Sequence, residues 1–180
     1  MRLILSLLSV FVLTVSCFSQ NTVADLKPSH AVTLKQFLSK NRKYQFLSSK
    51  VITNEYLKFM RESFGKTFEP YYRVADFNDD KIADFAVIVS RQGTRKASGA
   101  TSEEHKYDYP LAVVIFNGSK NGTFTKAFVE DIEAPHVCFL EIAKDKKTRL
   151  HFGVFETDAH TRIFKPVRRS YVVEYPDEFQ

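Results

Sequence analysis

Residues 72–89 read YRVADFNDDKIADFAVIV, in which an acidic loop joins two apolar segments. The residues before the loop (Tyr72–Ala75) and after it (Phe85–Val89) are mostly aliphatic or aromatic, which is typical of β-strands. The connection between them is short and rich in Asp and Asn, which favours a turn that brings the two strands side by side. This stretch therefore predicts an antiparallel strand pair, and the β-rich part of the chain begins with it.

The acidic loop carries oxygen side chains in the pattern D-x-N-x-D-x-x-x-D. Calcium prefers roughly six to eight hard oxygen ligands, and a tight loop supplies them by directing alternate side chains and a backbone carbonyl to one centre. The predicted metal ligands are the side chains of Asp76, Asn78, Asp80 and Asp84 with the carbonyl of Ile82. The alternative is an acidic turn closed by hydrogen bonds from side chains to the backbone.

Residues 74–89 resemble the FG-GAP or VCBS-type calcium loop, whose usual form reads like DFNGDGKxDLAV. Such loops occur in integrin α-subunit propellers and in many secreted bacterial proteins. The resemblance implies calcium as the bound ion and the same five ligands. Asp79 and Lys81 stand where the usual pattern has glycines, and Lys81 adds a positive charge beside the metal, so the sequence predicts a weakened site.

The resemblance is local, and the chain is too short to close a propeller, which needs at least four blades of about four strands each. A signal segment, two helices, one such loop and several hairpins together resemble single-copy bacterial secreted proteins. That wider resemblance implies no activity.

Outward from the loop, the sequence predicts two helices followed by strands. Apolar residues recur at helical spacing over Ser29–Lys40, and Thr53 or Asn54 can cap a second helix that stops at Gly65. The predicted strands are Tyr71–Ala75, Phe85–Ser90, Leu111–Phe116, Thr123–Glu130, Val137–Ala143, Arg149–Phe155, His160–Lys165 and Ser170–Tyr175. We expect an α+β fold in which two N-terminal helices pack on a largely antiparallel meander sheet.

Composition favours one domain that is held together by its core. The chain has 180 residues, 44% of them hydrophobic, and two cysteines, which excludes a disulfide framework. Cys138 lies in an apolar predicted strand, where a small buried thiol is expected. Residues 20–180 are predicted to form the single domain.

Residues 1–19 are predicted to be a signal peptide, because Arg2 is followed by an uncharged apolar run and then by small residues. The run is shorter than the ~20 residues that a membrane-spanning helix needs. A secreted or periplasmic location follows from this prediction. Cys17 resembles the cysteine of a bacterial lipobox, so the alternative is an envelope protein anchored through a lipid on Cys17, which would be its sole contact with a membrane.

Two further regions bear on function. Residues 91–108 are charged, contain Gly93 and Gly99, and lack apolar periodicity, which predicts a long surface loop. Glu156, Asp158 and His160 are two residues apart, a spacing that places them on one face of a strand, but residues 156–159 read better as a hairpin turn.

The leading hypothesis is a non-enzymatic secreted or periplasmic domain with a structural calcium loop and an unidentified protein or glycan as its partner. One alternative is a hydrolase that uses Asp76, Asp80 or Glu156 with His160 in acid–base chemistry. Another is a periplasmic inhibitor or envelope-associated binding protein. The sequence contains no recognised nucleic-acid-binding module, so nucleic acid is not expected as a partner.

Overall fold

The computed structural model describes residues 26–144 and 148–175, and it has a mixed α+β fold. The predicted signal peptide, with Cys17, lies outside the described residues. Within them, no helix combines the length and the apolar character that crossing a bilayer requires.

The described residues contain two α-helices, and both precede the long strands. Helix α1 (Pro28–Lys40) begins with a proline, which has no N–H to leave unpaired in the first turn. Helix α2 (Asn54–Phe64) is capped by Thr53, whose Oγ1 accepts a hydrogen bond from the backbone N–H of Tyr56 at 3.4 Å. It ends at Gly65, which has a φ of 110°. A short 3-10 helix, η2 (Ser49–Val51), lies between them.

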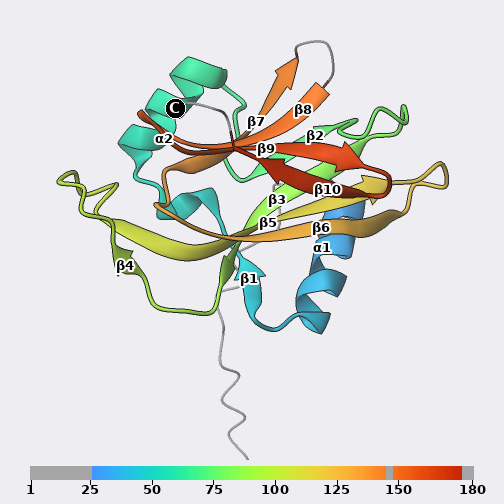
Figure 1. Cartoon of the computed structure of the whole chain (residues 1–180), viewed down its shortest axis with the longest axis horizontal. Helices are drawn as coiled ribbons and strands as arrows, with labels where there is room; N and C mark the ends of the chain where they lie inside the picture. The colour runs from blue at the N-terminus through green and yellow to red at the C-terminus, as the bar shows by residue number, and fades with distance from the viewer. Residues whose placement is uncertain (1–25, 145–147, 176–180) are drawn as a thin grey trace, which may run out of the picture.

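In the described part of the chain, ten strands form two antiparallel sheets (Figure 1). The strands are β1 (Tyr44–Phe46), β2 (Tyr72–Ala75), β3 (Asp84–Arg91), β4 (Lys96–Ala97), β5 (Tyr107–Gly118), β6 (Phe124–Ala134), β7 (Cys138–Lys144), β8 (Thr148–Val154), β9 (Thr157–Val167) and β10 (Ser170–Glu174). The first sheet has the order β1-β3-β5-β4, with β2 also paired to β3 and β6 to β5, and the second is the meander β7 to β10.

The strands do not continue in the single meander that the sequence predicts, because β7 does not pair with β6. Between these strands Pro135 has no N–H to donate to a ladder, and its carbonyl instead accepts a hydrogen bond from the N–H of Cys138 at 3.2 Å. This turn redirects the chain, and a second sheet begins at Cys138.

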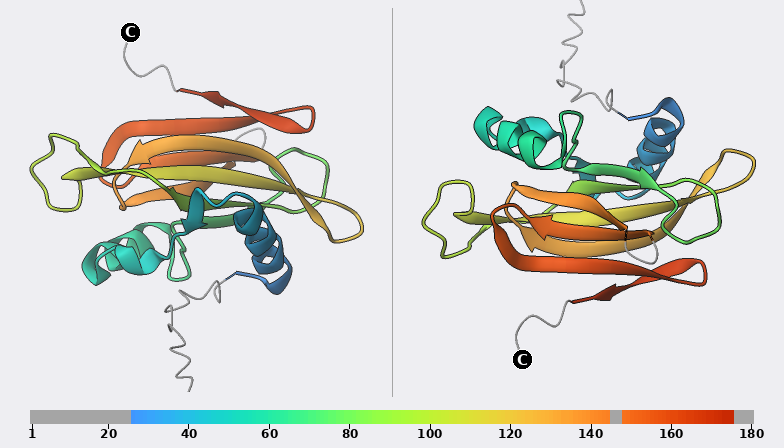
Figure 2. Two further views of the ribbon diagram at one scale, coloured as in Figure 1. Left: turned by 90° about the horizontal axis from the view of Figure 1, so that it is seen from below. Right: turned by 90° about the horizontal axis from the view of Figure 1, so that it is seen from above.

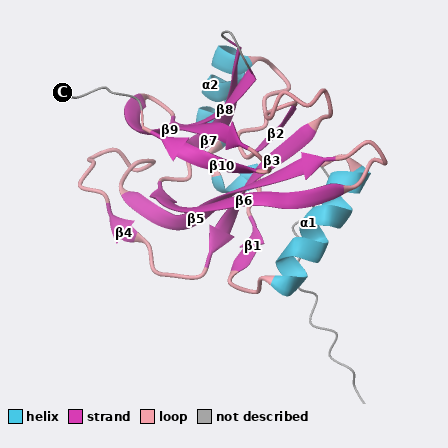
Figure 3. Cartoon of the chain, turned by 45° about the vertical axis from the view of Figure 1, so that its right-hand side comes forward, coloured by secondary structure: helices cyan, strands magenta, loops and turns pink. Residues whose placement is uncertain are grey.

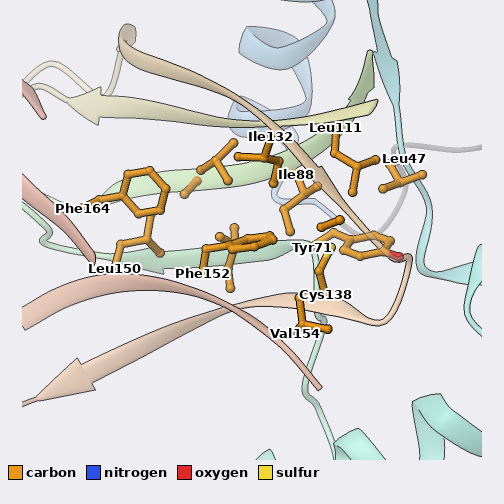
Figure 4. Packing of buried hydrophobic residues seen from close by; sticks show 14 of the residues in the cluster. Leu47, Tyr71, Ile88, Leu111, Ile132, Cys138, Leu150, Phe152, Val154 and Phe164 are labelled. Carbon is orange, nitrogen blue, oxygen red and sulfur yellow. The ribbon is translucent and has the colours of Figure 1, made fainter. Parts of the chain in front are cut away.

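The central strands of the first sheet, β3 and β5, are buried on both faces. Figure 2 shows both helices on one side of the molecule and the β9–β10 hairpin on the other. The larger core cluster lies between the two sheets; Figure 4 shows Ile88 and Ile132 of the first sheet near Phe152 and Phe164 of the second. A smaller cluster on the opposite face joins α1 to β3 and β5.

This burial accounts for the near-continuous apolar sequence of β3, because both of its faces are covered. Cys138 belongs to the larger cluster and is fully buried, as the sequence predicts. Its burial raises the pKa of the thiol, so it stays protonated.

The turn between β8 and β9 is tighter than the sequence predicts. Val154 pairs with Thr157, which leaves only Phe155 and Glu156 in the turn, and Glu156 has a φ of 62°. The predicted surface loop 91–108 also contains a strand, because Lys96 and Ala97 form β4 and pair with Asp108 and Tyr107.

Candidate metal loop

The acidic loop connects β2 to β3, and these two strands pair antiparallel up to its base (Figure 3). Ala75 is the register partner of Asp84, so residues 76–83 form the connection between them. Phe77 is fully buried in the larger core cluster. The predicted strand pair therefore exists, and Phe77 anchors its loop to the core.

Three of the predicted ligands are joined by hydrogen bonds within the loop. The carboxylate of Asp76 accepts the N–H of Asp80 at 3.1 Å and that of Lys81 at 2.8 Å. The side-chain oxygen of Asn78 also accepts the N–H of Asp80, at 3.0 Å. Asp80 Oδ1 accepts the N–H of Ile82 at 2.8 Å, and Asn78 Nδ2 donates to Asp80 Oδ2 at 3.2 Å. These bonds bring Asp76, Asn78 and Asp80 together around one turn of backbone.

The two non-glycine residues at the glycine positions adopt a left-handed backbone. Asp79 has a φ of 62° and Lys81 a φ of 68°. Asp tolerates this conformation well, whereas Lys there costs about 1 kcal/mol. The loop therefore keeps the backbone geometry expected of glycines, and the strain falls mainly on Lys81.

Asp84 is the fully buried member of the set, with no exposed surface. Its Oδ2 accepts the N–H of Phe77 and its Oδ1 accepts the N–H of Gly118, both at 2.9 Å. Burial raises the pKa of Asp84 to about 6, the two hydrogen bonds oppose this shift, and the charges of Asp80 and Asp76 add to it. Asp84 thus connects the base of the loop to the end of β5, and the charges of Asp76 and Asp80 contribute to its raised pKa.

The end of β5 fits closely against the loop. A Cβ built on Gly118 would lie 2.2 Å from the carbonyl oxygen of Ala83 and 3.0 Å from Cγ2 of Ile82. Only a residue without a side chain fits there. The strand predicted over Leu111–Phe116 ends before Gly118, but β5 extends through Gly118 and the turn follows at residues 119–123.

The second sheet also contributes two residues near the loop. Arg149 of β8 has its Nη1 3.6 Å from Oδ2 of Asp79. Tyr171 of β10 donates a hydrogen bond to Asn117 Oδ1 at 2.9 Å, and burial together with the charges of Asp84, Asp76 and Asp80 raises the pKa of its phenol. Sequence reasoning missed these residues because they are remote along the chain and belong to no motif.

The donor set is oxygen-rich, as calcium requires, but the loop is already closed by its own hydrogen bonds. Among the described residues, no group of three or more His, Cys, Asp or Glu side chains is arranged to hold a metal ion. The oxygens that accept loop N–H groups each retain a lone pair, because a carboxylate offers about four acceptor sites and an amide oxygen two. The same side chains therefore suit a hydrogen-bonded turn and, after local adjustment, a cation site.

Searches of protein-family models, of curated proteins and of solved structures find no match to this chain. The geometry of the loop therefore provides the physical basis for a functional proposal.

The carboxylates considered for acid–base chemistry do not share a site. Asp79 in the acidic loop lies beside Arg149 near the start of β8, whereas Glu156 follows the end of that strand. At ~3.3 Å per residue, the five steps from Arg149 to Val154, the last residue of β8, span about 16 Å, and Glu156 lies beyond them in the turn. The side chains of Asp158 and His160 lie outside the described residues.

Proposed function

We propose that the protein is a non-enzymatic exported domain whose loop 76–84 binds calcium in a structural role. The observation that carries this proposal is that the side chains of Asp76, Asn78 and Asp80 gather around one turn of backbone, with the buried carboxylate of Asp84 at the base of the same loop. The local FG-GAP-like spacing supports calcium as the ion, because every ligand it implies is a hard oxygen donor.

In this proposal Asp76, Asn78, Asp80 and Asp84 would hold the ion with the Ile82 carbonyl. Bound calcium supplies positive charge that offsets the carboxylate repulsion. The chain's own residues provide the frame: Phe77 anchors the loop in the core, and the N–H of Gly118 holds the carboxylate of Asp84. Because the loop joins β2 to β3 and contacts β5, its stabilisation is transmitted to the first sheet.

The experiment is thermal unfolding in calcium, in magnesium and in a chelator. A ligand that binds only the folded state stabilises it by about 2.7 kcal/mol at a concentration of 100 times its Kd, so calcium is expected to raise the unfolding midpoint. Magnesium is expected to do so less, because it demands a stricter octahedral site.

Two matched variants separate calcium binding from ordinary charge effects. Asp80→Asn keeps an oxygen that accepts the Ile82 N–H but removes the charge, and it should abolish the calcium response. Asp131→Asn removes a charge that pairs with Lys43 and Arg91, and it should leave the response intact. An identical midpoint of the wild type in calcium and in chelator would support the hydrogen-bonded turn instead.

Export forms the second part of the proposal. Residues 1–19 would be removed as a signal peptide, or Cys17 would carry a lipid that anchors the protein in the envelope, and the partner would be a protein or a glycan. Mass spectrometry of the protein from its native source tests this. An N-terminus at Gln20 supports secretion or a periplasmic location, a lipidated Cys17 supports the anchored form, and an intact Met1 contradicts both.

A further inference from the structure

Positive charge is concentrated in the segment of the chain that contains α1. Residues 26–54 include six Lys and Arg residues and no Asp or Glu. Over the whole chain the two signs are far closer to balance, with 26 basic and 21 acidic residues. A long stretch without a carboxylate therefore gives the surface around α1 a positive potential.

The outward face of α1 carries two of these cations and an apolar residue. Lys35 and Lys40 are exposed, and Val32, one turn before Lys35, is 56% exposed. Arg42 follows the helix and is exposed as well. Between described residues, no ion pair involves Lys35, Lys40 or Arg42. The charge of this face is therefore not neutralised within the described part of the chain.

A hollow of about 520 Å³ lies beside this face, between α1 and β6. Its lining combines aromatic rings with lysines, and includes Phe37, Lys40, Lys43, Tyr44, Phe124 and Lys126. Lys43 pairs with Asp131 at 3.3 Å, whereas Lys40 and Lys126 form no ion pair with any described residue. No carboxylate belongs to the described lining. The hollow thus offers an anionic group two cations from different elements.

The position of α1 along the chain brings this face close to the predicted export segment. Leu26, just before α1, is buried in the smaller core cluster with this helix. Nine residues separate it from Cys17, a length that spans at most about 30 Å. A lipid on Cys17 would therefore hold α1 near the bilayer. Figure 2 shows α1 and the β9–β10 hairpin on opposite sides of the molecule, so the hairpin would face away.

We propose that the outward face of α1 docks on a bilayer surface rich in anionic phospholipids. Lys35, Lys40 and Arg42 would bind headgroup phosphates, and one phosphate would enter the hollow between Lys40 and Lys126. Val32 would insert at the boundary between headgroups and acyl chains. The proposal rests on the proposed export for its setting beside a membrane, and it adds a second membrane contact to the lipid on Cys17.

The test is co-sedimentation of the full-length protein with vesicles of phosphatidylcholine alone and with vesicles of equal parts phosphatidylcholine and phosphatidylglycerol. A chelator is present throughout, so that calcium cannot bridge the acidic loop to the lipid. The apolar residues 3–15, or a lipid on Cys17, bind both kinds of vesicle. The ratio of the two partition coefficients, anionic over neutral, therefore isolates the contribution of charge.

Each Lys or Arg near an anionic surface contributes about fivefold to this ratio. With three or more cations in contact, we expect the wild-type ratio to be about 100 at low ionic strength and to fall steeply as salt is added. Replacing two cations by the double variant Lys35→Gln, Lys40→Gln should lower the ratio about 25-fold.

The matched control removes two charges from the opposite side of the molecule. Arg168 and Arg169 are exposed at the turn between β9 and β10. The double variant Arg168→Gln, Arg169→Gln has the same net charge as the lysine variant and should keep the wild-type ratio. Equal losses in the two double variants would show a response to net charge alone and would overturn the proposal.

Circular dichroism checks that each variant folds. If the lysine double variant does not fold, Lys126→Gln on the exposed surface of β6 replaces it, with an expected loss of about fivefold. A wild-type ratio near one, or tighter binding to soluble polyglutamate than to anionic vesicles, would also overturn the proposal. Failure of the export proposal is seen separately, as an intact Met1 in the native protein, and failure of the calcium proposal as an unchanged unfolding midpoint.

Discussion

Replacing Gly118 by alanine tests how the acidic loop is attached to the sheet. The added Cβ would lie 2.2 Å from the Ala83 carbonyl oxygen, far inside van der Waals contact, and both atoms belong to or adjoin rigid backbone. Either the loop or the end of β5 must move. That movement displaces the Gly118 N–H from Asp84 Oδ1, which it now meets at 2.9 Å.

The expected cost follows from three contributions. Overpacking a close contact costs about 1–3 kcal/mol, and a weakened hydrogen bond to a buried carboxylate costs about 1.5–3 kcal/mol. Alanine also lowers the conformational entropy of the unfolded chain relative to glycine, which offsets about 0.4–1 kcal/mol of this cost. We expect Gly118→Ala to lower the free energy of unfolding by about 2–4 kcal/mol and to raise the pKa of Asp84 further.

Urea denaturation measures the free energy of unfolding, and NMR of the carboxyl carbon measures the pKa of Asp84. With a slope of about 1–3 kcal/mol per molar urea, the midpoint should fall by about 0.7 M or more. Gly122→Ala is the control, because a Cβ there meets nothing within 4 Å and costs only the strain of its φ of 77°. That strain is about 1 kcal/mol. If Gly118→Ala is no more destabilising than Gly122→Ala, the close fit between β5 and the loop is not real.

Three further variants address charge and backbone strain. Lys81→Gly should relieve about 1 kcal/mol of backbone strain and increase the calcium-induced shift of the thermal midpoint; an equal or smaller shift would contradict this. Asp84 has a folded pKa of about 6 against 3.8 unfolded, so its contribution to stability falls by about 3 kcal/mol as pH rises between those values. Asp84→Asn should therefore gain stability relative to the wild type over this range, measured by urea midpoints at a series of pH values. Burial, helped by the charge of Lys27, lowers the pKa of His30 from 6.5 to about 4, so the stability it contributes at neutral pH is lost as pH falls. The free energy of unfolding should therefore decrease less between about pH 7 and pH 5 in His30→Phe than in the wild type, by about 2 kcal/mol. An unchanged decrease would refute this assignment.

The acidic loop and the strand pair around it could be predicted from the sequence. The apolar segments on either side and the Asp and Asn spacing predict the β2–β3 connection, and the left-handed conformations of Asp79 and Lys81 follow from their places in the motif. The signal comes from residues that are neighbours along the chain, so no long-range information is needed.

The attachments of the loop could not be predicted in the same way. Gly118, Arg149 and Tyr171 reach it from β5, β8 and β10, and only the pairing of remote strands brings them close. The division into two sheets depends on the turn at Pro135, because the sequence pattern of β6 and β7 is equally consistent with a continued meander. The short turn at Glu156 could not be predicted for another reason. Glu156 adopts a positive φ although it is not a glycine, so the usual sequence signal for a tight turn is missing there.

Direct calorimetric titration of the protein with calcium tests the central claim most directly. We expect saturable binding of one calcium ion per chain, lost in Asp80→Asn and retained in Asp131→Asn. An absence of binding to the wild type at millimolar calcium would contradict the claim, and the loop would then be an acidic turn closed by its own hydrogen bonds.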